Sequence, residues 1–232
     1  MNDNLLETNM STLKEASTKA LELLKGLYDF KFFNKDNYEK NIETFQFVLV
    51  EEDETKLFSE GQFALYVAKT NAIYVKEDML RMGVIDKEQV TKMLLHELVH
   101  MASANRKRNR VGFNHEASPI TYNEGCTQYL TLKLYDKENF DKEIENNIMY
   151  PQSTKIVKEC VDDLGEETIF KGFFEANLRK SVYGFSPKTL DRWIDYVMKL
   201  SNTLEEKISK ENNERLVNKI EEAKGTLSAW MK

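Results

Sequence analysis

The 232-residue sequence has little proline, glycine or cysteine, and it lacks a long apolar run. With only 3 Pro and 9 Gly, the chain is neither a linker nor a low-complexity sequence. No stretch is apolar enough to span a bilayer, and residues 1–26 are charged, without the apolar segment of a secretory signal. The two cysteines, Cys126 and Cys160, form no disulfide framework and fit a reducing compartment. We therefore expect a cytoplasmic protein with no membrane contact.

Excess positive charge is also lacking, because the formal net charge is -6. A mildly acidic chain has no general electrostatic attraction for nucleic acid, so a nucleic-acid partner is not expected. The exception is a basic run formed by Arg106, Lys107, Arg108 and Arg110. It is interpreted either as the solvated C-terminal end of a helix, where cations are favourable, or as a patch that attracts an acidic substrate.

Periodicity in the N-terminal part of the chain predicts one helix and three strands. Apolar residues at helical spacing predict a helix over residues 4–25. Aromatic and β-branched residues predict strands at 45–50, 63–68 and 72–75. The short polar gap between the last two strands predicts a hairpin.

The rest of the chain is predicted to be helical. Helices are expected over residues 87–105, around 120–135, and over 187–200 and 203–230. The expected capping residues are Asp86 with Gln89, Ser118 or Thr121, and Ser186 followed by Pro187. A small antiparallel sheet followed by helices is an α+β order, and hydrophobic residues, at 41%, suffice for one core.

The segment His96-Glu97-Leu98-Val99-His100 lies inside the expected helix 87–105. Residues four apart share a helix face, so His96 and His100 can direct two imidazoles at one ion. Glu97 lies about 100° around the helix, where it can reach a water bound to that ion and accept its proton. The alternative interpretation is a core helix with two hydrogen-bonded histidines. The chain has only 3 His, which makes a chance match rare.

A catalytic zinc takes three protein ligands and keeps one open position. A metzincin would place Gly at position 103 and His at 106, but Ser103 and Arg106 stand there and exclude that class. Glu124 and His115 remain as candidates for the third ligand. Glu124 stands on the next expected helix, and the stretch between it and His100 is long enough for a loop and an antiparallel return.

The neighbours of Glu124 suit a position beside a metal centre. Gly125 removes a side chain where the two helices would have to approach each other. Thr127 and Gln128 share the face of Glu124 and could hydrogen-bond the imidazoles. The alternative is that Thr121 and Glu124 form a capping box at the start of the helix.

The HExxH segment followed by Asn-Glu-Gly on a second helix resembles the gluzincin peptidases, the thermolysin-like class. The segment from Asn123 to Thr131 is similar to small bacterial gluzincins, and the hairpin ending in Ala72–Val75 is similar to the ImmA- and IrrE-like regulatory peptidases. The resemblance covers roughly residues 63–135. It implies a zincin-like core that binds zinc. Related chains often carry an acidic residue at the position of Gln128. Gln128 adds no negative charge, so a lower metal affinity is expected.

The resemblance implies that His96, His100 and Glu124 hold the zinc and that Glu97 is the general base. Gluzincins also use a Tyr or His to stabilise the oxyanion, for which His115 and Tyr183 are candidates because each lies in an expected loop.

We therefore expect a zinc metallopeptidase with one Zn²⁺ per chain and a peptide or protein substrate. Residues 1–232 are expected to form a single domain, with a catalytic core at about 40–135 and a helical part at about 150–232. An extended substrate is expected to add to the sheet edge near Ile73. The alternative is a non-catalytic binding or regulatory module, with His115 completing a closed zinc site.

Overall fold

The computed structural model describes residues 3–50, 58, 61–81, 83–113 and 119–211. The helices are α1 (Asp3–Leu24), α2 (Lys35–Ile42), α3 (Lys87–Ser103), α4 (Ile120–Tyr135), α5 (Phe140–Glu145), α6 (Pro151–Leu164), α7 (Glu166–Phe170), α8 (Leu178–Val182) and α9 (Pro187–Ser201). The strands are β1 (Gln46–Val50), β2 (Ala64–Val67), β3 (Ala72–Lys76), β4 (Ala104–Asn105) and β5 (Arg110–Val111). Short 3₁₀ helices are η1 (Lys25–Asp29), η3 (Glu77–Leu80), η4 (Arg106–Arg108) and η5 (Phe173–Glu175).

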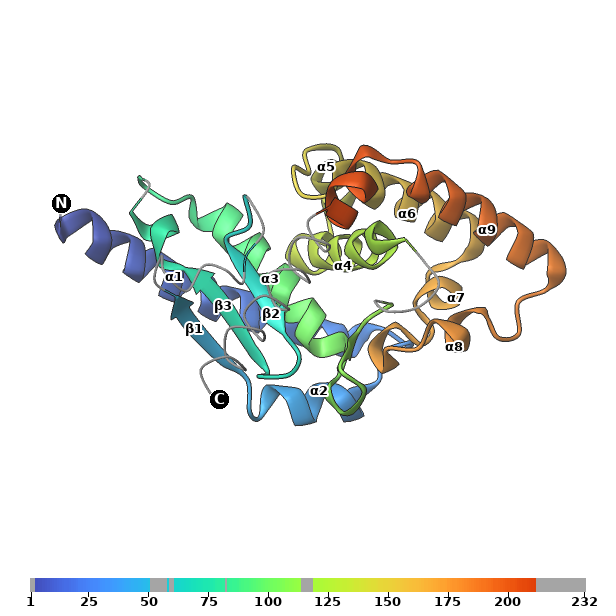
Figure 1. Ribbon diagram of the computed structural model, residues 1–232, viewed down its shortest axis with the longest axis horizontal. Helices are drawn as coiled ribbons and strands as arrows, with labels where there is room; N and C mark the ends of the chain where they lie inside the picture. The colour runs from blue at the N-terminus through green and yellow to red at the C-terminus, as the bar shows by residue number, and fades with distance from the viewer. Residues whose placement is uncertain (1–2, 51–57, 59–60, 82, 114–118, 212–232) are drawn as a thin grey trace, which may run out of the picture.

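These elements form the mainly helical α+β fold that the sequence predicts. The sheet and α1 lie toward one end of the molecule, and α6 and α9 lie toward the other (Figure 1). Helices α3 and α4 lie between the two ends and pack against each other. This arrangement places the HExxH segment at the centre of the molecule.

Within the described residues, three strands form the larger sheet in the order β1-β3-β2. The predicted hairpin is confirmed, because β2 and β3 pair antiparallel. Strand β1 runs parallel to β3, so the sheet is mixed rather than purely antiparallel. The next strand along the chain, β2, lies on the other side of β3 from β1. Ile73 pairs with Phe47 on one side and with Tyr66 on the other. The expected substrate edge near Ile73 is therefore wrong, because Ile73 lies in the central strand.

The HExxH helix begins where predicted and ends earlier. Asp86 caps α3, and its side chain accepts hydrogen bonds from the backbone N–H groups of Glu88 and Gln89. Helix α3 ends at Ser103, because the chain turns there into the β4–β5 hairpin. The basic run at 106–110 belongs to this hairpin, so its interpretation as a helix end is wrong.

The next helix, α4, is capped from a distant part of the chain. Thr121 lies inside the first turn of α4, and its backbone N–H and hydroxyl donate to Glu206 Oε2 at 2.9 and 2.7 Å. Thr121 is therefore not the capping residue, while Ser118 lies outside the described residues. Ser186 caps α9 as predicted, through a bond from the Thr189 N–H. The helix expected over 203–230 is present at 204–211, and the remainder lies outside the described residues.

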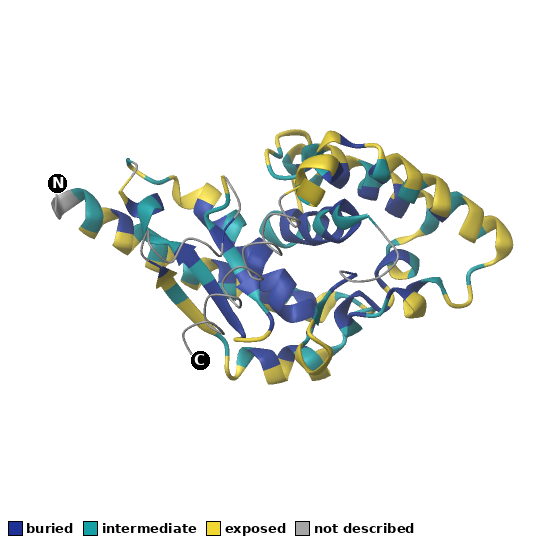
Figure 2. Cartoon of the chain, in the orientation of Figure 1, coloured by how far each residue is buried: buried dark blue, intermediate teal, exposed yellow. Residues whose placement is uncertain are grey.

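Buried residues concentrate on α3 and α4 (Figure 2). The fully buried side chains include Leu94, Leu95 and Leu98 of α3, and α1 packs along the same helix. Cys126 and Cys160 are buried free thiols. Within the described part of the chain, no helix is long and apolar enough to cross a membrane.

Candidate metal centre

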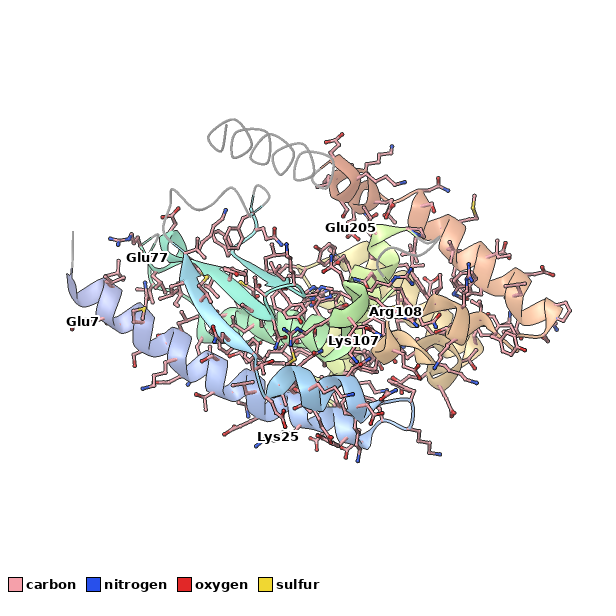
Figure 3. All side chains as sticks on the ribbon, turned by 60° about the horizontal axis from the view of Figure 1, so that its bottom comes forward. Glu7, Lys25, Glu77, Lys107, Arg108 and Glu205 are labelled. Carbon is pink, nitrogen blue, oxygen red and sulfur yellow. The ribbon has the colours of Figure 1, made fainter. Side chains whose placement is uncertain are left out.

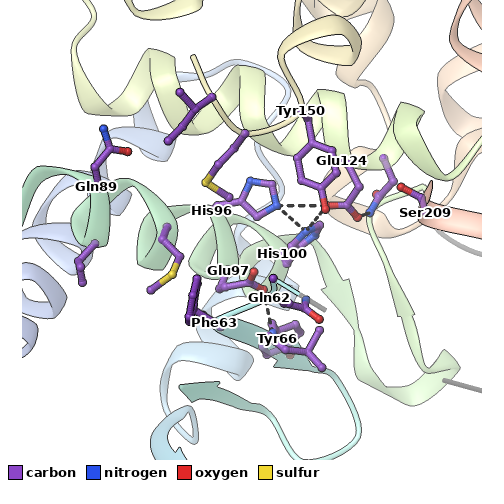
Figure 4. Close-up of a pocket in the computed structure, with 18 of the residues that line it drawn as sticks. Gln62, Phe63, Tyr66, Gln89, His96, Glu97, His100, Glu124, Tyr150 and Ser209 are labelled. Carbon is purple, nitrogen blue, oxygen red and sulfur yellow. Dashed lines mark hydrogen bonds and ion pairs between the residues drawn. The ribbon is translucent and has the colours of Figure 1, made fainter. Parts of the chain in front are cut away.

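The buried middle of α3 presents the HExxH side chains to one cleft. His96, Glu97 and His100 are only 2%, 6% and 8% exposed, yet all three line this cleft. The ring nitrogens of the two histidines approach each other because four residues separate them on the helix. Figure 4 shows both rings turned toward Glu124 of α4.

Three atoms meet in a compact triangle. His96 Nε2 lies 3.1 Å from His100 Nε2, and each nitrogen lies 3.2 Å from Glu124 Oε2. Ligand atoms bound to a tetrahedral zinc at about 2.0–2.1 Å lie roughly 3.3–3.4 Å apart. The triangle therefore has the spacing that one zinc ion requires, after a shift of a few tenths of an ångström at most.

The outer ring nitrogens are held so that the inner ones can be ligands. His96 Nδ1 lies 2.8 Å from Gln128 Oε1, an acceptor, which makes Nδ1 the protonated nitrogen. Thr127 donates its hydroxyl proton to Asn123 O, so its oxygen can accept from His100 Nδ1, a longer contact of 3.4 Å. Each Nε2 atom can then offer its lone pair to a metal ion that binds beside Glu124.

Glu124 is fixed from its own helix. Asn123 Nδ2 donates to Glu124 Oε1 at 3.3 Å, and Asn123 Oδ1 accepts from the Phe113 N–H at 2.8 Å. Burial would raise the pKa of Glu124, but the neighbouring His100 and His96 lower it overall, so Glu124 is an anion. Its carboxylate faces the imidazoles, which does not fit the capping-box interpretation.

Glu97 lies in the same cleft but outside the triangle. Its Oε2 accepts the backbone N–H of Tyr66 in β2 at 2.8 Å, which fixes the carboxylate between the sheet and the histidines (Figure 4). The pKa of Glu97 is raised to about 7, mainly by burial. His96 and the Tyr66 N–H oppose this rise, and Glu124 adds to it. A carboxylate tuned to neutral pH can both accept and release a proton.

The cleft around these groups has a volume of about 640 Å³. Residues 61–66 form one wall, and Ile148, Met149 and Tyr150 form another. Two imidazole nitrogens and one carboxylate oxygen are the donor set of a catalytic zinc, whose fourth position must stay open. The residues present fit such an ion, and all three of them line the cleft.

Tyr150 is a site residue that sequence reasoning missed. Its ring stacks on His96, with centroids 5.8 Å apart and planes 17° apart. The negative charge of Glu124 raises the pKa of Tyr150 well above its usual value, and burial and Glu97 add to the effect. The phenol therefore stays protonated and can donate a hydrogen bond. Its one sequence signal is Pro151, which marks the start of α6.

Two further expectations about the site are corrected. Tyr183 is 85% exposed at the end of α8 and does not line the cleft, while His115 lies outside the described residues. Gly125 does not serve the contact with α3. A Cβ there would lie 3.0 Å from Ser153 O and Val157 Cγ2, so this glycine permits the close approach of α6.

Comparison with protein-family models, with curated proteins and with solved structures finds no match for this chain. Functional inference therefore depends on the geometry of the cleft.

Proposed function

We propose that this protein is a zinc-dependent metallopeptidase of the gluzincin type. The observation that carries the proposal is the triangle of His96 Nε2, His100 Nε2 and Glu124 Oε2, with the separate carboxylate of Glu97 in the same cleft. A structural zinc would need a fourth protein ligand and would not need Glu97.

The residues divide the chemistry among them. A bound zinc would polarise the scissile carbonyl and make a water acidic near neutral pH. Glu97, a buried carboxylate in the same cleft, would take a proton from that water and pass it to the leaving amine. Tyr150 donates its phenol proton in a hydrogen bond to the carbonyl oxygen as negative charge develops there.

The outer strand β2 supports a proposal for how the substrate binds. Phe63 O accepts from the Lys76 N–H of β3, whereas the Tyr66 N–H points the other way, to Glu97. Alternate residues of a strand present their backbone groups to the same side. The backbone N–H and C=O of Ala64 therefore face the cleft, as the N–H of Tyr66 does. We propose that an extended peptide pairs with the backbone of Ala64, two residues before Tyr66, whose N–H is occupied by Glu97.

The test is incubation of the zinc-loaded protein with a peptide library, read by mass spectrometry. We expect cleavage at internal or terminal peptide bonds by the wild type. Glu97→Gln should keep one zinc and the fold, and it should lose turnover by about 10²-fold or more, because the proton acceptor is removed. Turnover by Glu97→Gln at the wild-type rate would contradict the mechanism.

A non-catalytic zinc-containing binding or regulatory module is the second candidate. It requires a fourth protein ligand, for which His115 is the candidate. His115→Ala separates the two: a catalytic site keeps its zinc affinity, and a closed structural site loses much of it.

A further inference from the structure

We infer that Asn147 is a positioning residue that holds Tyr150 in register with the metal ligands; this inference rests on the proposed function. Asn147 lies in the turn after α5, three residues before Tyr150, and it is half-buried. Its side-chain amide connects the histidine side of the site with the segment that carries Tyr150.

One end of the connection is the metal centre. Gln128 is fully buried and uses its two amide ends in different directions. Its Oε1 lies 2.8 Å from His96 Nδ1, and its Nε2 donates to Asn147 Oδ1 at 2.9 Å. Gln128, held by His96, therefore fixes the position of Asn147 relative to the metal ligands.

The other end is the backbone on both sides of Tyr150. Asn147 Oδ1 accepts from the Met149 N–H at 3.2 Å, and Asn147 Nδ2 donates to Met149 O at 2.5 Å. The same Nδ2 donates to Thr154 Oγ1 at 3.2 Å. The hydroxyl and N–H of Thr154 in turn donate to Tyr150 O at 2.7 and 2.9 Å.

This support matters because of the backbone conformation of Tyr150. Its φ of 52° and ψ of 48° are left-handed, a conformation that a large side chain adopts only where the surroundings impose it. In that conformation the ring stacks on His96 and the phenol points to the metal cluster (Figure 4). Only an amide supplies the acceptor and the donors that these four bonds require from one side chain.

The test uses acetohydroxamic acid, a small zinc-binding ligand whose oxygens mimic a developing oxyanion, and it needs no turnover. Its dissociation constant is measured on zinc-loaded wild type, Asn147→Ala, Tyr150→Phe and the double variant. We expect Tyr150→Phe to weaken binding about 10-fold or more, as loss of one hydrogen bond to a charged group does. Asn147→Ala should weaken it by a similar factor, and the double variant should be no weaker than Tyr150→Phe alone.

Losses that add in the double variant, or an unchanged dissociation constant in Asn147→Ala, would overturn the inference. Asn146→Ala is the matched control, because Asn146 is the exposed neighbour at the end of α5, and it should bind like the wild type. If Asn147→Ala does not fold, Asn147→Asp carries the same test, since it keeps the acceptor but loses the donor. If the peptide library test alone fails, the proposed function is wrong. The role of Asn147 is then still decided by the dissociation constants of acetohydroxamic acid.

Discussion

At the scale of single residues, the side chains of His96, His100, Glu97 and Glu124 each have a hydrogen-bond partner that fixes their orientation. Gln128 and Thr127 hold the outer nitrogens of the two histidines, so the inner nitrogens could bind a metal ion. The Tyr66 N–H holds one oxygen of Glu97 and keeps this carboxylate apart from the triangle. Two glutamates of neighbouring helices, Glu97 and Glu124, therefore differ in their surroundings, and in the proposed mechanism one is the base and the other an anionic ligand.

Tyr150, the proposed oxyanion donor, and Tyr183, which the structure removes from the cleft, give the first prediction at this scale. Tyr150→Phe should lower kcat by about 10²–10³-fold, since one donor to the oxyanion is removed, and should leave the zinc content unchanged. Tyr183→Phe should have no effect on kcat, because Tyr183 is exposed to solvent away from the cleft. Steady-state kinetics on a peptide found to be cleaved measure both. Equal effects of the two substitutions would contradict the assigned role of Tyr150.

At the scale of elements, the predictable helix starts are those with local caps. Asp86 and Ser186 bond N–H groups two or three residues ahead, so the pattern is visible in the sequence. The starts of α4 and α6 depend instead on Glu206 and Glu205, which are 85 and 52 residues away from Thr121 and Ser153. Figure 3 shows Glu205 on the last described helical segment. No local pattern could find these caps.

Removal of the distant cap gives a prediction that depends on pH. Burial would raise the pKa of Glu206, but the hydrogen bonds from Thr121 and the ion pair with Lys210 lower it below 4.5. A carboxyl whose pKa is lower in the folded state than in the unfolded state stabilises the fold at pH values above its unfolded-state pKa. That stabilisation is lost as the pH falls through the folded-state pKa. Glu206→Gln should therefore reduce the free energy of unfolding by about 1 kcal/mol at pH 7, as loss of a cap does.

Thermal melting at pH 7 and at pH 3.5 checks this. The difference between wild type and Glu206→Gln should shrink at pH 3.5, because this pH lies below the unfolded-state pKa of about 4.5, so the contribution of the lowered pKa is no longer complete. Glu211→Gln, an exposed residue of the same segment, is the matched control and should melt like the wild type at both values. A difference of the same size at both pH values would mean that the charge of Glu206 does not stabilise α4.

At the scale of the whole molecule, what the sequence could predict follows from distance along the chain. The hairpin and the HExxH face are local, and Glu124 is on the next helix, so these could be inferred. The parallel pairing of β1 with β3 depends on a crossover that no periodicity encodes. Tyr150 lies far beyond His100 in the sequence and outside any motif, and only packing of α6 against α4 brings it to the cleft.

The central claim is that α3 and α4 together form one zinc site, and a zinc titration tests it most directly. Wild type should bind about one zinc per chain, as measured by calorimetry and by metal analysis after dialysis. Glu124→Ala should lose most of this affinity, because two histidines remain as ligands. Glu138→Ala, an exposed acid just beyond the end of α4, should bind zinc like the wild type. Absence of zinc from the wild type, or full affinity in a folded Glu124→Ala protein, would contradict the account.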